Sequence, residues 1–175
     1  MKTPSRPRSL VLDANVLIDY ALSEPSVLGL AARHLGPVLV PFPVLEEVDQ
    51  LSEEDCTGLG LTVVEPTADE MLAAAAAGGR LSFQDHLCFL LARKDGATCV
   101  TNDSRLRREC TGSGIEVLWG LEVMADLVET HALETEFALA TARAIHEANP
   151  RHITNGILNR FEARLRSLGK PRRAT

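Results

Sequence analysis

Hydrophobic residues follow two patterns along the chain. Short uninterrupted apolar runs, bounded by polar residues, glycine or proline, alternate with longer segments in which apolar residues recur every three or four positions. The first pattern is typical of strands buried on both faces of a parallel sheet, and the second of amphipathic helices. The runs predict strands at residues 10–12, 38–40, 61–64, 97–101 and 115–118. The periodic segments predict helices at residues 14–22, 26–34, 44–51, 68–77, 83–95 and 105–110, with a helix end and loop at 52–60.

The regular alternation of these elements predicts an α/β fold, in which helices cover both faces of a mainly parallel, five-stranded sheet. Beyond Gly120 the periodicity is helical throughout. Two apolar stripes, separated by Asn149-Pro150, consist of Leu133, Phe137, Ala140 and Ala144 and of Ile153, Ile157, Phe161, Leu165 and Leu168. We therefore expect a helical extension over residues 121–170 that packs on a domain of residues 9–120 or forms a dimer surface.

The net charge of the chain is −6, which by itself disfavours a nucleic-acid partner. Basic residues nevertheless gather at both ends of the chain, with Lys2, Arg6 and Arg8 at one end and seven lysines and arginines from Arg151 to Arg173 at the other. This distribution fits a polyanionic partner at the termini. It equally fits solvated tails on an acidic globule, and composition does not choose between the two.

The chain has no run of about 18 uncharged apolar residues and no apolar segment of signal-peptide type near its start. We therefore expect a cytoplasmic protein that does not enter a membrane. Its four cysteines, Cys56, Cys88, Cys99 and Cys110, lack the paired spacing of zinc sites. They are expected to be core thiols rather than metal ligands or disulfide partners.

Carboxylates follow several of the predicted strands. Asp13 follows the first strand and Asp103 the fourth, while Glu46 and Glu47 come after the second. Asp85 lies at the start of the helix that leads into the fourth strand. Ligand sites in open α/β sheets lie beyond the carboxyl ends of the strands, and clustered carboxylates are preferred ligands of Mg²⁺ and Mn²⁺. The sequence therefore predicts a metal site at this edge.

Each acid also has a purely structural interpretation. Asp13 and Asp103 precede predicted helices and are suitable N-cap residues. Asp85 comes three residues after Ser82, which is the spacing of a capping box. Glu47, like Glu46, is compatible with an ordinary exposed helix position. These interpretations stay open on the sequence alone.

Four segments together resemble the successive motifs of PIN-domain nucleases: residues 11–18, 44–51, 81–86 and 100–103. The resemblance covers residues 9–118 and depends on the order and spacing of the motifs. It implies a three-layer α/β/α fold and cleavage of RNA with one or two Mg²⁺ or Mn²⁺ ions, as in VapC toxin ribonucleases and related RNA-processing enzymes. It also implies an RNA substrate, and an antitoxin partner if the chain is a toxin. A homodimer is expected on other grounds, because dimers are the commonest soluble oligomers and the apolar C-terminal stripes would suit a dimer interface.

Carried over residue by residue, the resemblance makes Asp13, Glu47, Asp85 and Asp103 the catalytic and metal-binding acids. Asn15 and Thr101 would orient carboxylates or water around them. Glu47 is preferred to Glu46 because the glutamate of the family commonly precedes an aliphatic residue, as Glu47 precedes Val48. Arginines that could bind RNA phosphates are Arg105, Arg107, Arg108, Arg160 and Arg164. Trp119, the single tryptophan, is interpreted as a core residue.

Two other functions are also compatible with parts of the sequence. A phosphatase of the haloacid dehalogenase type also begins with an aspartate after its first strand, but it needs a second aspartate two residues later, where this chain has Asn15. A non-catalytic PIN-like scaffold would instead bind RNA or protein through its basic tail and C-terminal helices. A requirement for metal distinguishes the nuclease from the scaffold.

Overall fold

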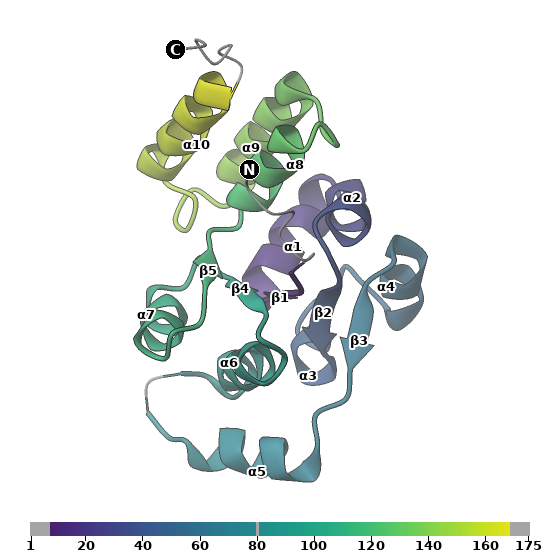
Figure 1. The fold of residues 1–175 in the computed structure, drawn as a ribbon, viewed down its shortest axis with the longest axis vertical. Coiled ribbons are helices and arrows are strands. Elements are labelled where there is room, and N and C mark those ends of the chain that lie inside the picture. Colours follow the sequence, from purple (N-terminus) through teal and green to yellow (C-terminus); the bar gives the residue numbers. More distant parts are fainter. Residues whose placement is uncertain (1–7, 80, 169–175) are drawn as a thin grey trace, which may run out of the picture.

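The computed structural model describes residues 8–79 and 81–168, and its centre is a sheet of five parallel strands (Figure 1). The order across the sheet is β3-β2-β1-β4-β5. The strands are β1 (Leu10–Leu12), β2 (Val38–Pro41), β3 (Thr62–Val64), β4 (Thr98–Val100) and β5 (Val117–Leu118). The predicted α/β class is confirmed, and every strand pair in the sheet is parallel.

Helices flank this sheet, in agreement with a three-layer α/β/α arrangement (Figure 1). Those that follow or connect the strands are α1 (Ala14–Ser23), α2 (Ser26–His34), α3 (Phe42–Leu45), α4 (Glu53–Leu59), α5 (Ala68–Ala76), α6 (Phe83–Asp95) and α7 (Ser104–Gly112). Helix α6 packs across β1, β2 and β4, while α7 packs beside β5. The start of α6 is therefore held close to the middle of the sheet.

Strand β1 occupies the centre of the sheet, and all three of its residues are apolar and buried. Leu10 lies opposite Val38 of β2, and Leu12 lies opposite Val100 of β4. This parallel register sets the residues after β1 and β4 side by side. Asp13 and Thr101 consequently lie at the same edge of the sheet.

The predicted helix at 44–51 and loop at 52–60 are wrong. The helix there is α3, which ends at Leu45, and the chain continues through turns to Ser52. Ser52 and Asp55 form a reciprocal capping box that begins α4, and Gly60 ends it in a left-handed conformation with φ of 80°. The apolar spacing of Val44, Val48 and Leu51 is satisfied by successive turns that bury all three side chains, so periodicity alone overextended the helix.

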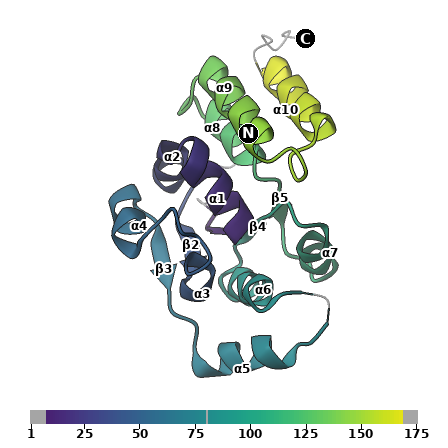
Figure 2. The ribbon, with the colours of Figure 1, turned by 180° about the vertical axis from the view of Figure 1, so that it is seen from behind.

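The C-terminal part folds as three helices, α8 (Glu122–Glu129), α9 (Thr135–Ala148) and α10 (Asn155–Leu168), which gather at one end of the molecule (Figure 2). Helix α8 packs on α2, α9 packs on α1, and α10 packs on both α8 and α9. The buried hydroxyl of Tyr20 in α1 donates a 2.7 Å hydrogen bond to the carbonyl oxygen of Gly120, just before α8. These contacts join the C-terminal helices to the sheet domain.

The predicted stripe on α9 is displaced. Its buried residues are Ala138, Thr141, Ala142 and Ile145, whereas Phe137 is 41% exposed. Helix α9 contacts both α1 and α10. The side of the helix that is buried in these contacts differs from the side that carries the predicted apolar stripe. The second stripe is correct in part: Phe161 and Leu165 of α10 and Ile153 just before it are buried, whereas Ile157 and Leu168 are partly exposed. Within residues 8–79 and 81–168, no helix is long and apolar enough to cross a membrane.

Candidate functional site

Asp13 lies between β1 and α1 and is only 1% exposed. One carboxylate oxygen, Oδ1, accepts a 2.8 Å hydrogen bond from the backbone N–H of Val16 and so caps α1. The other oxygen, Oδ2, accepts a hydrogen bond from the hydroxyl of Thr101. The carboxylate is thus fixed at the carboxyl end of the central strand, and its capping role leaves Oδ2 directed toward β4.

Thr101 connects two of the predicted acids. Its side chain is fully buried directly after β4, where its hydroxyl donates to Asp13 and accepts a 3.0 Å hydrogen bond from the backbone N–H of Asp103. Asp103 then caps α7, because its Oδ1 accepts hydrogen bonds of 2.8 and 2.9 Å from the N–H groups of Arg105 and Leu106. The structural interpretation of both aspartates as N-caps is correct, and their caps occupy Oδ1 in each case.

Glu47 and Asp85 line one pocket of about 410 Å³ next to these residues. The lining consists of Ala14, Asn15, Ile18, Val44, Glu47, Ser82, Gln84, Asp85 and Cys88. Ser82 caps α6 by accepting a 3.0 Å hydrogen bond from the N–H of Asp85, which orients the first turn of that helix. Glu46 is absent from this lining although it is adjacent in sequence. Gln84 is a polar group of the pocket that sequence reasoning missed, and its position beside Asp85 in the first turn was the available signal.

Burial and electrostatic repulsion raise the pKa values of Asp13, Glu47 and Asp85. Burial raises the pKa of Asp13 from 3.8 to about 7, against the opposing hydrogen bonds from Thr101 and Val16, and the charge of Asp85 adds to the increase. Burial raises the pKa of Asp85 as well, with a further contribution from the charge of Asp103. The pKa of Glu47 is raised by desolvation and by the charge of Asp85. Asp85 therefore interacts electrostatically with each of the other three acids.

The structure thus brings all four predicted acids into one region of negative charge. None of them forms an ion pair with a lysine, arginine or histidine in the part of the chain that the structure describes. Among those same residues, no group of three or more His, Cys, Asp and Glu side chains lies close enough to hold a metal ion directly. The four acids are neighbours, but no three of them are close enough to bind one metal ion directly.

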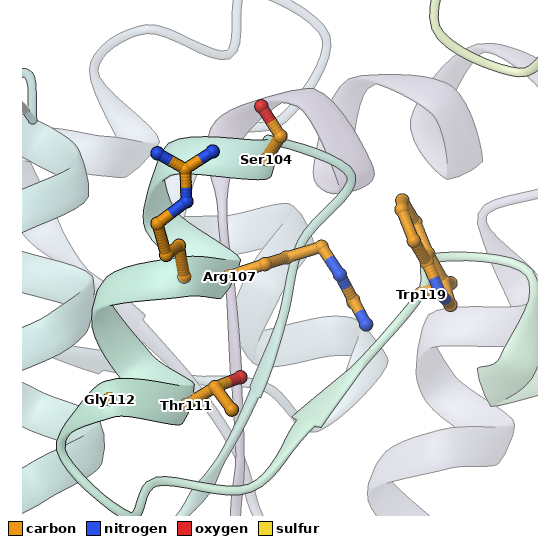
Figure 3. A pocket seen from close by; sticks show the side chains of 6 residues that line it. Ser104, Arg107, Thr111, Gly112 and Trp119 are labelled. Atoms are coloured by element: carbon orange, nitrogen blue, oxygen red, sulfur yellow. The ribbon is translucent and has the colours of Figure 1, made fainter.

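The predicted arginines divide into two groups. Arg107 reaches from α7 to the indole of Trp119, with its guanidinium carbon 3.7 Å from the ring centroid, and Arg160 lies 5.9 Å from the same ring (Figure 3). Burial lowers the pKa of Arg107. Arg105 and Arg108 are exposed on α7. Arg164 instead contacts three carboxylates, those of Glu122, Asp126 and Glu129, so its charge is already compensated.

Two remaining expectations are resolved by the side chains. Trp119 is half-buried and lines an open pocket, so its interpretation as a core residue is wrong. Trp119 follows β5, a short strand at the edge of the sheet, where few neighbouring helices or strands can bury a large side chain. All four cysteines are buried and free, as predicted.

No protein-family model matches this chain, and no curated protein matches it either. A function must therefore be inferred from the fold and from the chemistry of the four acids.

Proposed function

We propose that this protein is a divalent-metal-dependent endoribonuclease that hydrolyses RNA phosphodiester bonds, in the manner of the PIN-domain nucleases that its sequence resembles. The observation that carries the proposal is the gathering of Asp13, Glu47, Asp85 and Asp103 at the carboxyl end of a parallel sheet. Structural capping accounts for one oxygen of Asp13 and one of Asp103. It does not account for Glu47, or for the convergence of four like charges.

The donor set suits Mg²⁺ or Mn²⁺. Both are hard cations that prefer carboxylate oxygens, and Mg²⁺ usually keeps several water ligands while binding only one or two carboxylates. A bound cation would also offset the desolvation and the charge repulsion that raise the pKa values of Asp13, Asp85 and Glu47. Asp13, Glu47, Asp85 and Asp103 are the residues that would hold it.

When bound, such a cation supplies charge neutralisation at the phosphate and lowers the pKa of a water molecule. The residues of the chain then have distinct tasks. Thr101 fixes the orientation of Asp13 through its hydroxyl and the position of Asp103 through its accepted N–H bond. Asn15 and Gln84 line the pocket with amide groups, which can orient a phosphate or a water molecule by hydrogen bonding.

The experiment is cleavage of a mixed-sequence, end-labelled single-stranded RNA by the full chain with Mn²⁺, with Mg²⁺ and with EDTA. We expect internal cleavage with either cation and none with EDTA. The same assay with a generic phosphomonoester is expected to show no hydrolysis. Cleavage that continues in EDTA, or hydrolysis of the monoester without cleavage of RNA, would contradict the proposal.

A further inference from the structure

A second pocket, of about 580 Å³, lies between α7 and the segment after β5 (Figure 3). It is lined by Ser104, Arg107, Arg108, Thr111, Gly112 and Trp119. Two arginines, two hydroxyl groups and an indole thus surround one open space. In a chain with a net charge of −6, this is a local concentration of positive charge beside an aromatic ring.

The stack of Arg107 on Trp119 forms one wall of the pocket. The guanidinium is held over the indole at 3.7 Å and is fixed by a 3.2 Å hydrogen bond from Nη1 to the carbonyl oxygen of Thr101. The charge of Glu122 opposes the effect of burial on the pKa of Arg107, and the Glu122 carboxylate also accepts a hydrogen bond from the backbone N–H of Trp119. A guanidinium stacked on an aromatic ring presents a flat cationic surface, on which nucleic-acid bases commonly stack.

Helix α7 forms the other wall. Ser104, Arg108 and Thr111 recur at intervals of four and three residues, so they share one face of the helix. All three residues are exposed. Over the described ranges 8–79 and 81–168, neither Arg107 nor Arg108 forms an ion pair, in contrast to Arg164 with its three carboxylates. Hydroxyl and guanidinium groups are common ligands of phosphate oxygens.

We propose that this pocket binds single-stranded RNA, with phosphates on Arg107, Arg108 and the hydroxyls of α7 and a base stacked against the Arg107–Trp119 pair. The proposal rests on the proposed function in one respect, since it makes the pocket the place where the substrate strand is held. A single strand is favoured over a duplex because stacking on a side chain requires an unstacked base.

Two links connect this pocket with the acids, one along the chain and one through Thr101. Asp103 caps α7, and Ser104, its first residue, already lines the pocket. Thr101 binds Arg107 through its carbonyl oxygen and Asp13 through its hydroxyl. A strand held by α7 would therefore lie beside Asp103, the acid that caps this helix.

Trp119 is the single tryptophan, so tryptophan emission reports on this pocket directly. The test is a titration of the full chain with a short labelled oligoribonucleotide in EDTA, which prevents cleavage. Trp119 emission and the anisotropy of the label are followed together. We expect saturable quenching of Trp119 that parallels the rise in anisotropy, and much weaker quenching by a mononucleotide at the same nucleotide concentration.

Arg108→Glu and Arg33→Glu form a matched pair, because both residues are exposed arginines without an ion pair among the described residues. Arg33 lies on α2, which is distant from α7 (Figures 1 and 2). Arg108→Glu should weaken binding by about tenfold or more, since it removes a phosphate contact and adds a repulsive charge. Arg33→Glu should not. Binding without a change in Trp119 emission, equal binding by both variants, equal affinity for the mononucleotide, or no binding would each overturn the proposal.

The outcomes separate this inference from the nuclease. Binding as expected, together with an absence of metal-dependent cleavage, would leave the pocket assigned and refute the enzyme. Cleavage that Arg108→Glu leaves unchanged, with no quenching of Trp119, would leave the enzyme and refute the pocket.

Discussion

Without metal, Asp13→Asn is expected to be more stable than the wild type at pH 8, by about 4 kcal/mol in the free energy of unfolding. Native Asp13 has a pKa of about 7 instead of 3.8 because it is buried, which is a shift of about 3 pKa units. Each unit corresponds to about 1.4 kcal/mol. The carboxamide of Asn can keep the N-cap bond to Val16 through its oxygen and can donate to the hydroxyl of Thr101 through its NH₂ group. The substitution therefore removes the charge, keeps the cap and reverses the direction of the Thr101 hydrogen bond.

The sign of the pH dependence follows from proton binding. Between pH 4 and pH 7, native Asp13 holds a proton that the unfolded chain releases, so the stability of the wild type falls as pH rises through this window. The advantage of Asp13→Asn should therefore shrink as pH falls toward 4. Urea unfolding of both proteins in EDTA at several pH values measures this difference. Asp49→Asn, at an exposed turn position after α3, is the control and should follow the wild type. A destabilised Asp13→Asn at pH 8 would contradict the account of this carboxyl group.

The second large effect concerns two adjacent glutamates. Glu47→Gln is expected to lower metal-dependent RNA cleavage by more than about a hundredfold, because loss of groups that merely support metal ligands already costs about 10- to 100-fold. Glu46→Gln should cleave as the wild type does. The physical reason is that Glu47 lines the pocket beside Asp85 and Glu46 does not.

Initial cleavage rates at saturating Mn²⁺ and at limiting Mn²⁺ provide the measurement. Both glutamates are exposed, so neither substitution should disturb the fold, and urea unfolding serves as the control for this. Equal rates in the two variants would remove Glu47 from the proposed site. A loss confined to Glu46→Gln would reverse the choice between them.

The sheet could be predicted from the sequence because its central strands are buried on both faces and are therefore continuously apolar, as β1 and β2 are. The end of α3 could not be predicted from the sequence. The apolar spacing of Val44, Val48 and Leu51 fits either a continuous helix or successive turns. The capping box from Ser52 to Asp55 was present in the sequence and would have located α4.

The position of the acids after the strands was sufficient to predict that Asp13 and Asp103 lie at one edge, because parallel strands fix that geometry. The family resemblance made Thr101 a residue that orients carboxylates, but the local pattern did not show that its hydroxyl joins Asp13 to Asp103, since this depends on the orientation of the side chain toward both. The stack of Arg107 on Trp119 was missed for a similar reason. It joins α7 to the segment after β5, and no local pattern in either segment indicates the other.

The central claim is that the four acids form a cation site, and the most direct measurement is thermal unfolding with increasing Mn²⁺, followed by EDTA. Asp85→Asn is the variant, since Asp85 interacts with all three other acids, and Asp95→Asn at the exposed end of the same helix is its control. A cation that binds only the native state stabilises it by about 2.7 kcal/mol at a hundred times its dissociation constant. We predict that Mn²⁺ raises the melting temperature of the wild type and of Asp95→Asn, that EDTA reverses the gain, and that Asp85→Asn does not respond. An equal response of all three proteins, or a response of none, would contradict the claim.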